Sequence, residues 1–218
     1  HDLLLQRCIA EREAIGLTLH FTGSEIALDA LANGACELAG FHRPVAAGSQ
    51  AAVRPRIAGA GFVVPLARRE QGLIVAQGNP LRIRDVVDLA RPGIRFVNRQ
   101  RGAATRDWLD RLLRDARIDA QRIVGYEIEE ASHLSVAASV AAGDADAGFG
   151  LRAAALRFGL DFVPIGTETY WLAGLDGLDR EPRVRSLIAA VRRFAAETPG
   201  YGPAVQPRRK KPSRQATD

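Results

Sequence analysis

The stretch "ASHLSVAASVAAGDADAGFG", residues 131–150, joins a helix pattern to a strand pattern. Ser132 is a strong N-cap residue, and small and apolar residues then continue a helix as far as Gly143. A glycine at that point can take the left-handed conformation that ends a helix. The short apolar run 145–150 is typical of a buried strand. This stretch therefore predicts one helix–strand unit of an α/β protein.

A weaker copy of the same unit lies 109 residues earlier in the chain. Residues 22–41 again show a polar turn, a helical segment, a glycine (Gly34) and a strand pattern. Two similar units favour two similar lobes, and we predict that the chain crosses between them at residues 78–80 and 166–168. Clefts between lobes are common binding places for small ligands.

The other segments also alternate between strand and helix patterns, which predicts α/β architecture with largely parallel sheets. We expect helices over residues 2–14, 25–34, 83–90, 108–116, 132–143, 152–159 and 181–197. We expect strands over residues 17–21, 36–41, 94–98, 123–129, 145–150, 160–166 and 168–174, and two more within 61–80 that join through the charged stretch 68–70. The predicted lobes are residues 1–78 plus 168–200 and residues 79–167, followed by a disordered basic tail over 201–218.

Composition and charge exclude several classes of protein. The chain is 47% apolar and 25% charged, as in globular domains. No apolar run approaches the roughly 20 residues of a membrane-spanning helix, and no signal peptide is visible. Most of the net charge of +5 lies in the tail, on Arg208, Arg209, Lys210, Lys211 and Arg214. We favour a solvated tail over a phosphate-binding arm, and we predict that the nearly neutral body does not bind duplex DNA.

Metal and catalytic motifs are missing from the sequence. Cys8 and Cys36 lack metal-ligand spacing; we interpret them as small buried side chains and leave a disulfide open. The four histidines form no zinc motif, and the chain has no nucleophile elbow, Walker loop or dinucleotide-binding glycine motif. The sequence therefore predicts no metal, no cofactor and no enzyme activity.

Four turns that open predicted helices are candidates for an anion site. They are residues 1–2, 22–24, 102–105 and 131–133, and most of their side chains are small or carry a hydroxyl. The first N–H groups of a helix lack internal partners and the helix dipole favours an anion there. A single serine or threonine at such a place is usually an N-cap, but four such turns divided between two lobes favour a bound oxyanion.

The segment "VNRQRGAATRDWLD", residues 97–110, surrounds one of these turns with three arginines. Arg99 follows the strand directly, at the carboxyl end where open sheets bind ligands, so we predict that it faces the ligand and that Arg101 lies on the surface. At least one of the three arginines Arg99, Arg101 and Arg106 is expected to be solvated. His133, at a helix start, either donates to a bound anion or covers the helix end.

These segments carry a resemblance to a known family. The runs "RFVNRQRGAATRDWLDRLL" and "SHLSVAASVAAGDADAG", and more weakly "HDLLL", "LANGACELAGFH", "QGLIVAQGNP" and "GLDFVPIGTETYWL", resemble the periplasmic-binding-protein-like domain of the molybdate/tungstate-related group. The resemblance extends over residues 1 to about 196. That group includes regulators in which the domain follows a helix-turn-helix, and fusions to a molybdopterin-biosynthesis domain.

The resemblance implies an α/β, two-lobed type 2 periplasmic-binding-protein-like fold with two crossing segments and a central cleft. It places ligand contacts at His1, Asp2, Thr22, Gly23, Ser24, Arg99, Ala103, Ala104, Thr105, Ser132, His133 and Tyr170. The family usually has Gly-Ser-Gly-Thr where this chain has Gly-Ala-Ala-Thr at 102–105. Backbone N–H groups, not a serine hydroxyl, would therefore be the donors in that turn.

The function that the resemblance implies is the non-enzymatic binding of a small oxyanion: molybdate, tungstate or a molybdenum-cofactor-related molecule. We expect the sensor part of a cytoplasmic transcriptional regulator, with a DNA-binding module upstream of His1, no membrane insertion and the option of a homodimer. One alternative is the periplasmic solute-binding component of an ABC-type anion transporter. The other is an accessory domain of a molybdopterin-biosynthesis enzyme.

Overall fold

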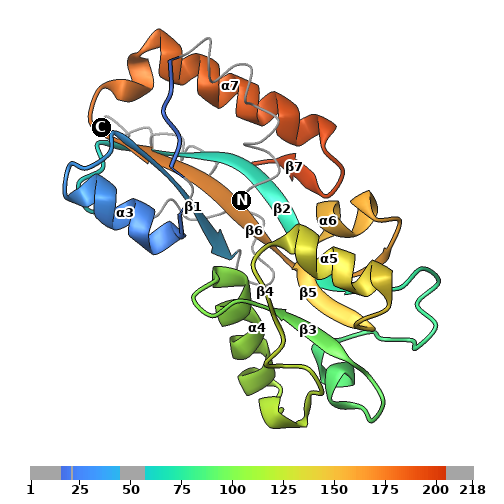
Figure 1. Ribbon diagram of the computed structural model, residues 1–218. Coiled ribbons are helices and arrows are strands. Elements are labelled where there is room, and N and C mark those ends of the chain that lie inside the picture. Colours follow the sequence, from blue (N-terminus) through green and yellow to red (C-terminus); the bar gives the residue numbers. More distant parts are fainter. Residues whose placement is uncertain (1–15, 21, 45–56, 205–218) are drawn as a thin grey trace, which may run out of the picture.

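The computed structural model describes residues 16–20, 22–44 and 57–204, and it shows a mixed sheet flanked by helices (Figure 1). The strands are β1 (Leu38–Pro44), β2 (Phe62–Val75), β3 (Phe96–Arg99), β4 (Glu129–Glu130), β5 (Ala147–Leu151), β6 (Asp161–Gly174) and β7 (Tyr201–Pro203). Their order is β1-β6-β2-β5-β3-β4, and β7 pairs with β2. The α-helices are α3 (Ser24–Ala32), α4 (Ala104–Asp115), α5 (His133–Ala142), α6 (Arg152–Arg157) and α7 (Pro182–Glu197). Three short 3-10 turns are η1 (Val86–Ala90), η2 (Ala120–Arg122) and η3 (Leu178–Arg180).

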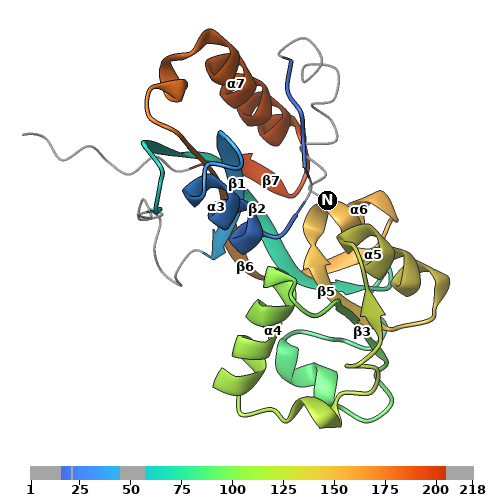
Figure 2. The same ribbon diagram turned by 60° about the vertical axis from the view of Figure 1, so that its left-hand side comes forward.

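Two long strands connect the two halves of the molecule. β2 and β6 have 14 residues each and pair antiparallel from Phe62↔Gly174 to Val75↔Asp161. They run side by side from the half with α3 and α7 to the half with α4, α5 and α6 (Figures 1 and 2). Irregularities in the pairing, which bend and twist a sheet, occur near Pro65 and near Gln71. This arrangement confirms the α/β, two-lobed type 2 fold with two crossing segments.

Each lobe has a core on both faces of its part of the sheet. Side chains alternate between the two faces of a strand, so neighbouring residues pack under different helices. In the first lobe, Trp171 of β6 packs on the side of α3, while Leu172 packs on the side of α7. In the second lobe, Leu73 of β2 packs on the side of α4, while Ile74 packs on the side of α5 and α6. The strands between these cores are therefore shared by both lobes.

The repeated helix–strand unit of the sequence is present in the structure. Ser24 begins α3 and His133 begins α5, 109 residues later, and the starts of β1 and β5 have the same spacing. Gly34 and Gly143 follow the two helices with positive φ of 71° and 79°. β1 pairs antiparallel with β6, and β5 pairs antiparallel with β2. The two units are thus placed equivalently on the two crossing strands.

Three predictions about the sheet were wrong. Residues 68–70 do not separate two strands, because Arg69 pairs with Glu168 across the ladder and Glu70 pairs with Arg152. The expected strands 160–166 and 168–174 are likewise one strand, β6. The sheet is not largely parallel either: among the described strands, the parallel pairs are β3–β5 and β3–β4. The crossing strands account for this difference, because they pair antiparallel with each other and with β1, β5 and β7.

Smaller differences concern the ends of the elements. The strand expected over 123–129 is reduced to β4, residues 17–20 form no strand, and the helix expected over 83–90 is the 3-10 turn η1. Residues 201–203, assigned to the tail, form β7. Residues 78–80 lie at the turn that follows β2, and the lobe boundaries at 78/79 and 167/168 stay predictions. The expected helix 2–14, Cys8 and residues 205–218 lie outside the described residues.

Candidate functional site

A group of buried polar side chains lies where the crossing strands meet the second lobe. Each is at most 9% exposed, although charged and polar side chains are normally at the surface. They come from β2, β3, β6 and the start of α5. We call this group the central polar cluster: Arg69, Gln71, Arg99, His133 and Glu168.

Arg99 is a buried guanidinium that no described carboxylate neutralises. It is the last residue of β3 and is 8% exposed. Its Nε donates to the carbonyl of Glu130 at 3.3 Å, and its Nη2 donates to the carbonyl of Ala131 at 3.1 Å. Arginine has five N–H donors, so several remain for a ligand. Burial, and next the charge of Arg69, lower the pKa of Arg99 to about 10. An anion in contact with Arg99 would offset this cost of burying its charge.

His133 begins α5 directly after the carbonyls that hold Arg99. Ser132 caps the helix, because its Oγ accepts from the Ser135 N–H at 3.0 Å and the Ser135 side chain bonds back. The His133 ring lies over Gly150, where an added Cβ would be 3.3 Å from Nδ1. Within the described part of the chain, this buried Nδ1 has no hydrogen-bond partner. Burial, and then Arg99 and Arg69, lower the pKa of His133 well below its ordinary value.

Three members of the cluster lie on the two crossing strands. Arg69 Nε donates to Glu168 Oε1, and Gln71 Nε2 donates to the same oxygen at 2.7 Å. Glu70, which lies between Arg69 and Gln71, points away and pairs with Arg152 at 3.0 Å. The alternation of side chains therefore places Arg69 and Gln71 on one face of β2. Gln71 is fully buried, and its Oε1 has no hydrogen-bond partner among the described residues.

His42 of the first lobe bonds to the start of α3 and is near enough to Arg69 for that charge to lower its pKa. The backbone N–H of His42 donates to Ser24 Oγ at 3.2 Å. The centres of the His42 and Tyr170 rings are 4.6 Å apart. Burial, and next the charge of Arg69, lower the pKa of His42 well below its ordinary value. The Tyr170 hydroxyl lies over Gly40, where an added Cβ would be 2.2 Å from it. Thr22 and Gly23, in front of α3, are exposed.

The other two arginines near Arg99 have structural partners. Arg101 is exposed and pairs with Glu127 at 2.7 Å, as predicted for a surface residue. Arg106 is only 4% exposed; its Nη1 donates to Glu129 at 3.0 Å and to the carbonyl of Arg99 at 3.2 Å. Its guanidinium also lies 4.3 Å from the centre of the Tyr126 ring. Arg106 therefore supports the backbone of Arg99.

The start of α4 offers backbone donors without a side-chain cap. Ala103 is the N-cap residue, and its own N–H donates to the carbonyl of Gln100 at 3.2 Å. Ala104 and Thr105 are the first helical residues, and Thr105 is buried. The first turns of α3, α4 and α5 all face the central region between the two halves (Figures 1 and 2). Their dipoles favour negative charge in that region.

The structure thus brings several predicted residues together. Arg99 and His133 belong to the central polar cluster, and Ser132 caps the helix that His133 begins. Tyr170 and Ser24 both contact His42 of the first lobe. His1 and Asp2 lie outside the described residues, and all twelve ligand contacts stay predictions. The residues that the sequence reading missed are His42, Arg69, Gln71 and Glu168. A signal was available for the two charged residues, Arg69 and Glu168, since charged residues inside an otherwise apolar strand need buried partners.

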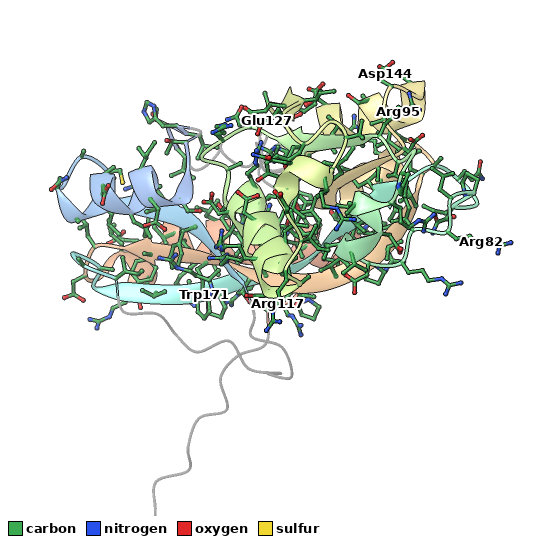
Figure 3. The ribbon with its side chains drawn as sticks, turned by 90° about the horizontal axis from the view of Figure 1, so that it is seen from below. Arg82, Arg95, Arg117, Glu127, Asp144 and Trp171 are labelled. Carbon is green, nitrogen blue, oxygen red and sulfur yellow. The ribbon has the colours of Figure 1, made fainter. Side chains whose placement is uncertain are left out.

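Other features of the described residues do not form a second chemical site. A surface hollow of about 480 Å³ lies beside η1, lined by Pro80, Leu81, Arg82, Arg84, Asp88 and Arg91. Arg82 projects outward at that end of the molecule (Figure 3). The described residues hold no group of three or more His, Cys, Asp or Glu side chains suited to a metal, and no described helix is long and apolar enough to cross a membrane. Cys36 is a free, half-buried cysteine.

Residues 7–192 match the family described as the PBP superfamily domain, which is most of the chain. The chain belongs to the PBP superfamily. Over 102 residues this PBP-superfamily chain is 38% identical to the uncharacterized protein YvgK of Bacillus subtilis (strain 168). That match covers 47% of this chain and 33% of YvgK, so the chain spans only part of this relative's length.

Solved structures with a similar fold include regulatory domains, such as that of MetR, a LysR family regulator from N. meningitidis. A cysteine-to-serine mutant of OxyR from Corynebacterium glutamicum, with H2O2 bound, has a TM-score of 0.60 and 14% identity, covering 89% of this chain and 61% of that one. The CcmR regulatory domain of Synechocystis PCC6803, in complex with 2-PG, has a TM-score of 0.59 and 17% identity, covering 87% of this chain and 88% of that one. At these identities the likeness concerns the fold.

Proposed function

We propose that the central polar cluster binds a small oxyanion and that this PBP-superfamily chain is the sensor part of a transcriptional regulator. The observation that carries the proposal is Arg99, a buried guanidinium whose described partners are two backbone carbonyls. A buried charge is stable only when it is paired, and an oxyanion suits the planar array of N–H donors of arginine. Molybdate, tungstate and molybdenum-cofactor-related anions are the ligands that the sequence resemblance implies.

The sensor role follows from how such a site responds to its ligand. Arg99 and His133 belong to the second lobe, while His42 and Ser24 belong to the first. An anion that contacts both lobes binds better to the conformation in which the lobes are close, and it shifts the population toward that conformation by its differential affinity. A regulator can use this shift to change a DNA-binding module or a dimer. The regulators among the solved neighbours support this role for a cytoplasmic protein.

The decisive experiment is a calorimetric titration of the chain with molybdate, tungstate, sulfate and phosphate. We expect at least one of these anions to bind with a Kd below millimolar. Arg99→Met should weaken that binding at least about thirtyfold, since removing one partner of a buried charge pair costs about 2–5 kcal/mol. Arg101→Met is the matched control, because Arg101 is exposed, and it should change the Kd by less than about twofold.

Two results would contradict this function. If none of the four anions bound more tightly than millimolar, the site would not be an oxyanion site. If Arg99→Met and Arg101→Met weakened binding equally, the anion would bind to surface charge outside the cluster.

A further inference from the structure

The ligand of the central polar cluster meets a buried acceptor as well as a buried positive charge. We propose that the bound oxyanion carries a hydrogen-bond donor of its own, as hydrogen phosphate does and sulfate does not, and that Gln71 selects for this donor. This inference rests on the proposed function, because it concerns the same site. It narrows the class of oxyanions away from fully deprotonated dianions such as molybdate.

The orientation of the Gln71 amide is determined by its neighbour. Its Nε2 donates to Glu168 Oε1 at 2.7 Å, and the same carboxylate oxygen accepts from Arg69 Nε. A carboxylate that accepts from a guanidinium is ionised and offers only lone pairs. Turning the amide over would bring Gln71 Oε1 against this oxygen, where two acceptors repel each other. Gln71 Oε1 therefore points away from Glu168.

That oxygen is an acceptor in need of a donor. Gln71 is 0% exposed, and its Oε1 has no hydrogen-bond partner among the described residues. Leaving a buried acceptor unpaired is costly, so a ligand that donates to it gains affinity. A ligand that presents only lone pairs adds repulsion to the unpaired cost. Sites built to bond a ligand N–H or O–H reject analogues that lack it far more strongly than apolar pockets reject a missing methylene.

Arg69 links the acceptor and the charge within the central polar cluster, and the proposal places one small anion against both. Arg69 shares Glu168 with Gln71, and the charge of Arg69 acts on both Arg99 and His133. His133 can bond to a ligand atom of either kind, because a neutral imidazole has one donor nitrogen and one acceptor nitrogen. Arg99 would thus pair with the negative charge of the ligand, and Gln71 Oε1 would accept a hydrogen bond from its protonated oxygen.

Inorganic phosphate and sulfate are a matched pair for testing this inference. Both are tetrahedral, but at neutral pH phosphate keeps at least one proton and sulfate keeps none. We expect calorimetric titration of the chain to give a Kd for phosphate at least about tenfold lower than for sulfate. Arsenate should behave as phosphate does, and molybdate should behave as sulfate does.

Two variants on the same strand assign the preference to its residue. Gln71→Leu should bring the Kd values for phosphate and sulfate within about threefold of each other. Glu70→Gln, whose side chain points away from the cluster, should keep the preference of the unaltered chain. If Gln71→Leu does not fold, the comparison of arsenate with molybdate on the unaltered chain still tests the donor requirement.

The outcomes separate the inference from the function on which it rests. Equal or tighter binding of sulfate and molybdate would overturn the donor requirement and leave the oxyanion site standing. An unchanged preference in a folded Gln71→Leu chain would overturn the role of Gln71. If phosphate, sulfate, arsenate and molybdate all failed to bind, the proposed function itself would be overturned.

Discussion

Two buried arginines lie at opposite ends of one short turn, and the structure treats them differently. Arg106 is surrounded by opposite charge and an aromatic ring; we call this group the Arg106 cluster: Arg106, Asp110, Tyr126 and Glu129. Arg99, seven residues earlier, has two backbone carbonyls as its described partners. Both side chains are less than 10% exposed.

The difference shows how a structural arginine can be told from one available to a ligand. Burying a charge is unfavourable unless paired groups restore what water provided. Arg106 has its pairing within the fold and supports the loop, including the carbonyl of Arg99. Arg99 is held in place by carbonyls that accept hydrogen bonds but carry no full charge. The two arginines are buried to a similar extent, so it is the charge of their partners that distinguishes a structural arginine from one available to a ligand.

If Arg106 is structural and Arg99 is available to a ligand, the two arginines should contribute differently to stability. Replacing Arg106 by methionine should lower the free energy of unfolding by about 2–4 kcal/mol, since it removes one partner of a largely buried ion pair. Replacing Arg99 by methionine should change it by less than about 1 kcal/mol, because an apolar side chain no longer carries a buried charge. Urea denaturation without added anion measures both values. A loss at Arg99 as large as that at Arg106 would show that Arg99 is a structural arginine too.

Acidification should affect the surroundings of Arg99 more than the Arg106 cluster, because the charge of Arg99 helps to lower the pKa of His133, and neither histidine with a shifted pKa belongs to the Arg106 cluster. The pKa values of His42 and His133 are lowered in the folded chain, so the unfolded chain binds more protons below the ordinary value of 6.5. Stability is then fully present above that pH. It should fall by up to about 1.4 kcal/mol per pH unit for each histidine until its folded pKa is reached.

Urea denaturation at a series of pH values measures this slope. His133→Gln should remove its share of the slope below pH 6.5, while the lowered pKa values of Asp88 and Asp146 affect stability only near and below their ordinary value of 3.8. A slope unaffected by His133→Gln would mean that the ring is not held neutral by its burial near Arg99 and Arg69.

The smallest effect is expected at the cap of α5, which positions His133. Ser132→Ala removes the side-chain acceptor for the Ser135 N–H, and loss of an N-cap typically costs about 1 kcal/mol. Thermal denaturation should show this loss, whereas Ser132→Asp, which keeps an acceptor at the helix start, should recover most of it. Equal stability of the two variants would indicate that the cap contributes little to the position of His133.

Much of the fold could be predicted from local patterns. Ser132 and Gly143 bound α5 as expected, Pro182 begins α7, and the repeated helix–strand unit has its predicted spacing. The long crossing strands could not be predicted in this way. Arg69 and Glu70 are typical of a turn when read alone, and only the ladder with β6 supplies the partners that keep β2 extended. Long-range pairing here overrides local preference.

The residues of the candidate site likewise fall into those that a local pattern indicates and those that only long-range pairing brings together. Arg99 and His133 could be recognised because each stands at the end of a strand or the start of a helix, where chain direction alone suggests a ligand. Gln71 and Glu168 lie in the interiors of β2 and β6 and are 97 residues apart in the sequence. They come into contact only once β2 and β6 pair, so no local pattern shows that these two residues meet.

The shared ladder of β2 and β6 also has a consequence for unfolding. Leu73 and Ile74 of β2 belong to the cores of the second lobe, while Phe62 and Leu66 of the same strand belong to a core of the first. Neither lobe can lose its sheet without exposing one end of a strand that the other lobe needs. The two halves are therefore expected to melt as one cooperative unit, although the fold has two lobes. A protein built this way can let its lobes move as bodies without letting either become a separate folding domain.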